Sequence, residues 1–168
     1  MARFKRWVCL AAILTLLSAC ATAAAALSLR NGVTWDTTVS QMLSAEGRAD
    51  GGNVNRGDLN GITYFYIWNR DGVTEDVYYA FRGDQLLMLY MLLPGGADGY
   101  EAQKDAQTAL YGSPADLTAD AVGALVSQLY PNTYLAQAAA WRLSDGSLAV
   151  LFTADGQCYL AYLNEPAL

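Results

Sequence analysis

The chain of 168 residues contains no histidine. This absence excludes Ser-His-Asp and Cys-His catalytic arrangements and every zinc or iron site that uses histidine ligands. The sequence also lacks the G-x-G-x-x-G and G-x-x-x-x-G-K-[ST] motifs of phosphate-binding loops. Paired carboxylates remain, but the adjacent Glu75 and Asp76 would point to opposite faces of a strand. The residues therefore indicate a protein that is not an enzyme, and no cofactor or metal is expected.

The first residues have the pattern of an export signal. Arg3, Lys5 and Arg6 precede an apolar run at residues 7–17, and small residues follow. This run is shorter than the roughly 20 residues that cross a bilayer, which is typical of a signal peptide. Removing these three cations changes the formal net charge from −6 to about −9. Nucleic acids bind clustered Lys and Arg, so no nucleic-acid partner is expected.

Two cleavage sites compete after the apolar run. Leu17-Ser18-Ala19-Cys20 resembles the lipobox of bacterial lipoproteins, in which the cysteine thiol is acylated and becomes the new N-terminus. Ala24-Ala25-Ala26 matches the A-x-A site of ordinary signal peptidase, with cleavage before Leu27. We favour the lipobox, which predicts an extracytoplasmic protein anchored to the cell membrane by lipid on Cys20. The alternative is a secreted protein without an anchor.

The lipobox divides the chain into three parts. Residues 1–19 are the predicted signal peptide, residues 20–32 a short alanine-rich tether, and residues 33–168 a single α+β domain. The alanine-rich residues of the tether reach roughly 20 Å at extended-chain spacing, so the domain is expected close to the bilayer.

Cysteine is scarce, and its positions predict no disulfide. Cys9 leaves with the signal and Cys20 is expected to be acylated, which leaves Cys158 without a partner. Cys158 lies in the stretch QCYLAYL, whose alternation is typical of a buried strand.

Periodicity and turn residues predict two meanders, each preceded by helix. A capping box of Thr38 and Gln41 opens the first helix, and the segment from 50 to 61 reads as a polar loop. The helices are expected at 38–47, 98–111 and 118–130, and the strands at 62–69, 73–82, 85–93, 139–144, 147–154 and 157–164.

This order predicts an α+β fold with an antiparallel sheet of two meanders and helices packed on one face. The two halves also align with one another, with Trp68 over Trp141, which suggests a tandem helix-plus-meander repeat.

Two motifs resemble a known family. Trp35, Thr38, Met42 and Gly47 follow the first-helix pattern of small exported bacterial proteins related to the SmpA/OmlA lipoproteins and the β-lactamase-inhibitor-protein-like (BLIP-like) fold, although Asp36 replaces the usual glycine. A second stretch resembles the end of a helix in that family, at Tyr100, Leu110, Tyr111, Gly112 and Pro114. The resemblance implies a protein that binds other proteins or has no assigned role, and it brings no catalytic residue.

One strand face is rich in aromatic residues. If helices cover the other face, this face presents a candidate binding surface for an envelope or extracellular protein. Exposed rings would equally stack on a glycan, and strands that are apolar on both faces are often simply buried. A carboxylate-dependent hydrolase is the third alternative. The candidate residues are Tyr64, Tyr66, Trp68, Tyr78, Arg82 and Tyr90.

The lipobox generates a direct prediction about the N-terminus. Cells expressing the protein should incorporate labelled palmitate into it, and the Cys20→Ser variant should lose the label because it has no thiol to acylate. Cys158→Ser is the matched control and should keep the label. Labelling that persists in Cys20→Ser would exclude the anchor.

Overall fold

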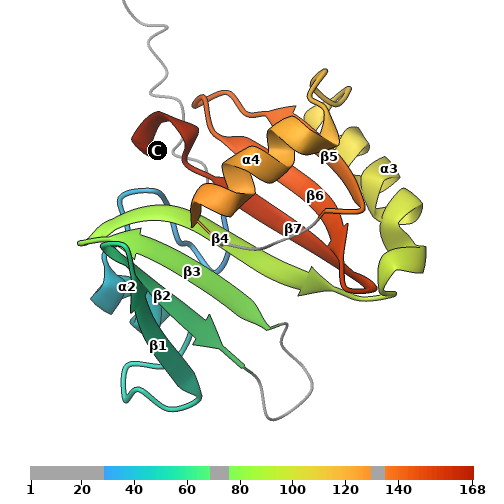
Figure 1. Cartoon of the computed structure of the whole chain (residues 1–168). Coiled ribbons are helices and arrows are strands. Elements are labelled where there is room, and N and C mark those ends of the chain that lie inside the picture. The colour runs from blue at the N-terminus through green and yellow to red at the C-terminus, as the bar shows by residue number, and fades with distance from the viewer. Residues whose placement is uncertain (1–28, 69–75, 130–134) are drawn as a thin grey trace, which may run out of the picture.

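In the computed structural model, residues 29–68, 76–129 and 135–168 are described, and their strands form one seven-stranded antiparallel sheet (Figure 1). The predicted α+β class with an antiparallel sheet of two meanders is confirmed. The strand order is β1-β2-β3-β4-β7-β6-β5. The strands are β1 (Val54–Leu59), β2 (Ile62–Ile67), β3 (Val77–Arg82), β4 (Gln85–Leu93), β5 (Gln137–Arg142), β6 (Leu148–Ala154) and β7 (Gln157–Leu163).

The helices lie between the strands along the chain. They are α2 (Val39–Ala45), α3 (Tyr100–Tyr111) and α4 (Ala119–Leu129), with short 3-10 helices η1 (Ala97–Gly99) and η2 (Glu165–Ala167). The predicted capping box begins α2: Thr38 Oγ1 accepts from the backbone N–H of Gln41, and the Gln41 side chain accepts from the backbone N–H of Thr38. In the part of the chain that is described, no helix has the length and apolar character needed to cross a membrane.

Strand β1 lies where the sequence predicted a polar loop. Asn60 and Gly61 have φ angles of 52° and 77°, the left-handed pair that a two-residue hairpin of type I′ requires. The turn therefore pairs β1 with β2 from Leu59 opposite Ile62 to Val54 opposite Ile67. The side chains from 55 to 59 are exposed, so β1 lacks the buried alternation by which strands are recognised.

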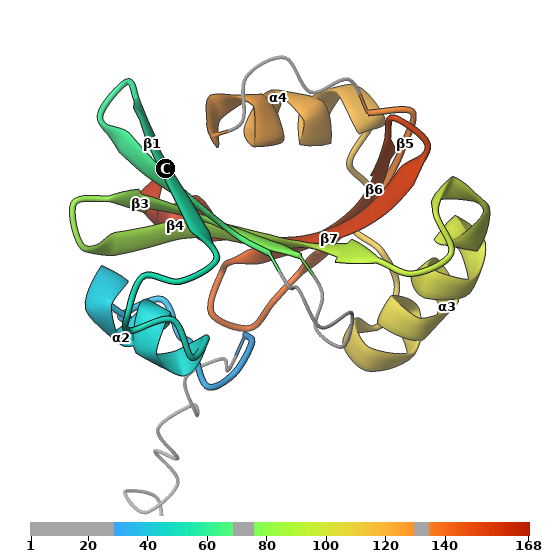
Figure 2. The ribbon, with the colours of Figure 1, turned by 90° about the horizontal axis from the view of Figure 1, so that it is seen from below.

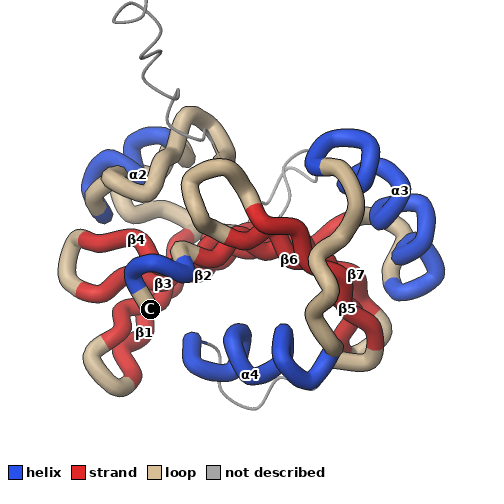
Figure 3. Tube along the Cα trace, turned by 90° about the horizontal axis from the view of Figure 1, so that it is seen from above, coloured by secondary structure: helices blue, strands red, loops and turns tan. Residues whose placement is uncertain are grey.

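The expectation that helices cover one face is wrong, because the sheet is covered on both sides. Figures 2 and 3 show α2 and α3 on one side and α4 on the other. Met42 of α2 and Tyr100 of α3 pack with Phe65 and Trp141, whereas Val122 of α4 belongs to the core of the opposite face. Central strands such as β6, in which every residue is buried, are apolar on both faces and need cover on both.

The two meanders join where β4 pairs with β7, and apart from the edge strand β1 the order is symmetric about the join. The proposed alignment of Trp68 with Trp141 is nevertheless wrong in register. Trp141 packs in the core under α2 and α3, while Trp68 contacts Tyr66 on the face that carries α4. A two-fold axis perpendicular to the sheet keeps each residue on its own face, so the two tryptophans are not equivalent.

Several expectations concern residues outside the described part of the chain. These are the signal peptide, the lipidated Cys20 and the alternative cleavage before Leu27. Leu29 is the first described residue, and it packs against the core under α2 and α3.

Trp141 is a sensitive test of this core. Its side chain is fully buried, and its Nε1 donates to the carbonyl oxygen of Gly112 at 3.0 Å. We expect Trp141→Ala to lower the free energy of unfolding by about 3–5 kcal/mol, measured by urea unfolding. The control Leu110→Ala, at a residue 71% exposed, should change it by less than about 0.5 kcal/mol. Equal losses in the two variants would contradict this packing.

Candidate binding face

The structure brings most of the predicted site residues together on the face that carries α4. Tyr64, Tyr66 and Trp68 come from β2 and its end, and Tyr78 comes from β3; all four are half-buried. Tyr90 of β4 lies beside Tyr78 but is only 7% exposed, so it belongs to the core and supports its neighbours rather than the surface.

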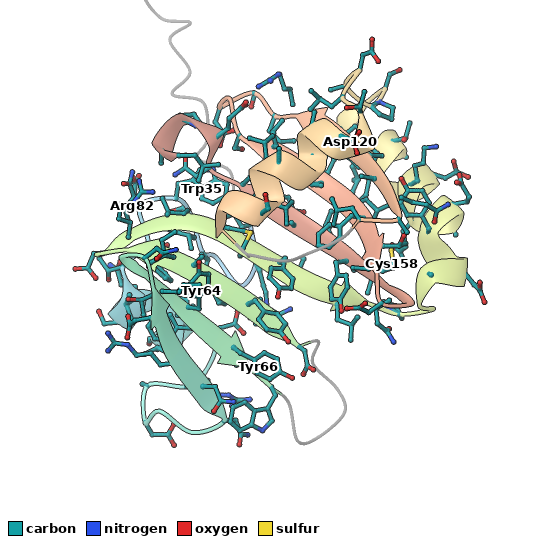
Figure 4. All side chains as sticks on the ribbon, in the orientation of Figure 1. Trp35, Tyr64, Tyr66, Arg82, Asp120 and Cys158 are labelled. Atoms are coloured by element: carbon teal, nitrogen blue, oxygen red, sulfur yellow. The ribbon has the colours of Figure 1, made fainter. Side chains whose placement is uncertain are left out.

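Arg82 lies apart from the tyrosines, at the end of β3 (Figure 4). Its side chain is exposed, and its Nη1 donates to the carbonyl oxygen of Ala167 at 3.2 Å. Ala167 and Leu168 in turn pack against the core of this face. Arg82 therefore fixes the C-terminal segment to the sheet. The sequence pattern did not indicate this contact.

Four rings form a continuous row across the strands, which we call the aromatic ladder: Trp68, Tyr66, Tyr78 and Tyr90. Tyr66 lies directly opposite Tyr78 in the strand register, and Tyr78 lies directly opposite Tyr90. The centroids of each of these two pairs are 4.4 Å apart, with interplanar angles of 19° and 7°. Trp68 ends the row, 5.8 Å from Tyr66 and tilted by 31°.

This stacking determines what the ladder presents outward. Rings stacked nearly parallel at this distance cover one another's faces, so their edges point away from the sheet. The hydroxyl group of Tyr66 donates a hydrogen bond to Asp76 Oδ2 at 2.8 Å. Burial, and then this hydrogen bond to a carboxylate, raise the pKa of Tyr66 above its ordinary value.

A hollow of about 280 Å³ lies between the ladder and β1. Tyr64, Tyr66 and Tyr78 line it from the sheet, and Gly57 lines it from the edge strand. Gly57 stands opposite Tyr64, and a Cβ added there would meet nothing within 4 Å. The missing side chain of Gly57 therefore keeps the hollow open along β1.

Helix α4 covers the other part of the same face. Val122 and Val126 are buried there with Val150 and Phe152 of β6 and Ala140 of β5. Figure 1 shows α4 in front of the strands of the second meander, while β1 and β2 of the first meander carry no helix on this side (Figures 1 and 2). The described part of this face is thus divided into a covered half and an open half.

The opposite face holds a polar network that sequence analysis did not find. Glu46 Oε1 accepts from Arg30 Nε at 2.9 Å and from the Tyr79 hydroxyl at 2.5 Å. Glu46 is 5% exposed in its side chain and Arg30 12%, so the charges are paired within the protein. Burial, and then the Glu46 carboxylate, raise the pKa of Tyr79. These residues lie far apart in sequence, and no local pattern links them.

Within residues 29–68, 76–129 and 135–168, no group of three or more Cys, Asp or Glu side chains is placed to hold a metal ion. Comparisons with protein-family models, with curated proteins and with solved structures found no match to this chain.

The tyrosines predict a loss of stability in alkali. Burial raises the pKa of Tyr66, Tyr79 and Tyr162, and it raises the pKa of Tyr100 to about 12. Unfolded tyrosine loses its proton near pH 10, so above that pH the folded chain binds more protons than the unfolded chain. The free energy of unfolding should therefore be insensitive to these groups below about pH 10 and fall above it.

Urea unfolding between about pH 8 and about pH 11.5 measures this decline. Tyr100→Phe removes one of the shifted groups and should decline less steeply above about pH 10 than the unaltered protein. A decline of the same steepness in both proteins would show that Tyr100 ionises equally in the folded and unfolded chains.

Proposed function

We propose that this protein is a non-catalytic lipoprotein of the cell envelope that binds another protein through the aromatic ladder and the hollow beside Gly57. The observation that carries the proposal is the half-buried aromatic surface next to an open hollow, at the part of the sheet that α4 leaves uncovered. Tyrosine and tryptophan are enriched where proteins bind proteins, because each buries a large area at a low entropic cost. The partner is an envelope or extracellular protein.

The ring geometry favours a protein partner over a glycan. A sugar ring stacks flat on an aromatic face, but the faces of Tyr66 and Tyr78 are turned toward each other at 4.4 Å. Edges and a groove suit the side chains of a protein segment better than a flat ring. Trp68, at the end of the ladder, is where a glycan would stack, and glycan binding is therefore the second candidate.

The described residues that line the hollow include no Asp or Glu. A hydrolase would need two carboxylates about 5 to 9.5 Å apart across its cleft, so the hollow gives no support to that third alternative.

The position of Leu29 determines how an anchored domain would be oriented. Leu29 packs on the side of α2 and α3, whereas the ladder lies on the side of α4. A chain anchored through Cys20 would therefore approach the domain from the side opposite the ladder. The binding face would point away from the bilayer, toward other envelope proteins.

Filling the hollow tests the proposal without removing core residues. Gly57→Trp places a large side chain in the hollow, and we expect affinity for the captured partner to fall at least about tenfold. Gly57→Ala adds one methyl group in open space and should retain binding. Neither change should lower the free energy of unfolding, since the position is exposed and β-strand backbone favours a side chain over none.

The partner is first identified by affinity capture from envelope extracts and mass spectrometry, and its affinity is then measured with the purified proteins. Leu110→Trp, on the exposed surface of α3, is the control for a large side chain placed elsewhere. If Gly57→Trp bound as tightly as this control, the hollow would not be the binding site. Loss of binding to a glycan array in Trp68→Ala, without any protein partner, would favour the second candidate.

A further inference from the structure

Among the described strands, β1 is an edge of the sheet that pairs only with β2, and its outer backbone groups face away from the sheet in a defined pattern. The carbonyl oxygen of Asn53 accepts from the backbone N–H of Trp68 at 3.2 Å, and Leu59 pairs with Ile62 across the two-residue turn. Because antiparallel bonds alternate along a strand, the odd-numbered residues of β1 bond to β2. The backbone N–H and C=O groups of Arg56 and Asp58 therefore point away from the sheet.

Opposite charges flank the centre of this edge. The side chains of Arg56 and Asp58 lie on the same face, 3.6 Å apart, and are 64% and 61% exposed. Gly57 lies between them, with its open side toward the hollow. The guanidinium of Arg56 lies 5.9 Å from the centroid of the Phe65 ring, which places both charges on the side of α2.

We propose that β1 pairs in antiparallel fashion with β1 of a second copy of this chain, centred on Gly57 opposite Gly57. In this register Arg56 of each copy stands opposite Asp58 of the other, and these two residues carry the outward-facing backbone groups. The two copies can therefore exchange backbone hydrogen bonds at the positions where their charges attract.

The charges select this register over its neighbours. A shift of one residue sets outward-facing groups against groups that are already bonded to β2, so the backbone bonds are lost. A shift of two residues places Arg56 opposite Arg56, or Asp58 opposite Asp58, and like charges directly opposite each other are destabilising. The centred pairing is the arrangement that satisfies both the backbone and the charges.

The geometry of such a pair agrees with a membrane anchor. The two-fold axis of antiparallel pairing is perpendicular to the sheet, so each face of one copy continues into the same face of the other. Both Leu29 residues would lie on one side of the joined sheet, and both aromatic ladders on the other. Two anchored copies could thus share one bilayer. This inference does not depend on what the ladder binds.

Disulfide trapping in the native envelope tests the register with the full chain. At a centred non-hydrogen-bonded pair the two Cα atoms lie about 4.5 Å apart, within the range of a disulfide. Gly57→Cys should give a covalent dimer on a non-reducing gel. Asn55→Cys is the matched control: in this register it faces Leu59 of the other copy, with its own counterpart about 14 Å away, so it should not crosslink.

Charge exchange in the Gly57→Cys background tests why the register is chosen. Arg56→Asp alone and Asp58→Arg alone each set like charges opposite each other, and each should reduce the dimer yield about tenfold. The double variant Arg56→Asp/Asp58→Arg restores opposite charges and should restore the yield. Because both side chains are exposed, urea unfolding of the reduced, monomeric protein should be unchanged in all three variants.

Two results would overturn the proposal. One is a Gly57→Cys dimer yield no higher than that of Asn55→Cys. The other is a yield that does not respond to the charge exchanges. In either case, the charged side chains of β1 would instead prevent this edge strand from pairing with another chain, as charges on edge strands commonly do. A variant that fails to pair but still captures its partner protein would leave the proposed function intact.

Discussion

The antiparallel pairing of β4 with β7 is the constraint on which the rest of the structure depends. It runs from Met88 opposite Leu163 to Leu93 opposite Cys158 and converts two separate meanders into one sheet. It makes β4 and β7 interior strands, beside β6, which lies between β5 and β7, and most side chains of these three strands are buried. Interior strands of this kind are apolar on both faces, so helices are required on both sides. Helices α2 and α3 on one side and α4 on the other provide this cover.

The same constraint explains where the open surface lies. One helix, α4, covers the second meander on its side, and its Val122 and Val126 reach the core there. The first meander replaces such a helix with the stacked rings of Tyr66, Tyr78 and Tyr90, which shield each other and the sheet beneath them. Aromatic stacking is thus a structural substitute for a helix on this half, and it leaves polar edges and a hollow where a helix would leave a covered core.

Much of the fold could be predicted from the sequence, because its main elements have local signals. The capping box of Thr38 and Gln41, the stripe of Val122 and Val126, and the apolar runs of β4 and β6 each indicate an element within a few residues. Strand β1 could not be predicted in this way, since its stability comes from the hairpin turn and its pairing with β2. The candidate site was predicted only in part: the shared face of Tyr64 and Tyr66 follows from alternation, but the hollow beside Gly57 depends on strand register.

The two faces of the sheet differ in the kind of interaction that holds them: a buried polar network on one face and stacked aromatic rings on the other. On the side of α2, Glu46 gathers Arg30 and Tyr79 into a closed polar network that ties the start of the domain to β3. These hydrogen bonds fix Arg30, which lies next to the first described residue, to the sheet. On the side of α4, the rings of Tyr66, Tyr78 and Tyr90 are held in place by cross-strand register, and they share no residue with the Glu46 network. Under the proposed function, a partner bound to the ladder would therefore leave the Glu46 network undisturbed, and an anchored domain would present the ladder on the side opposite Leu29.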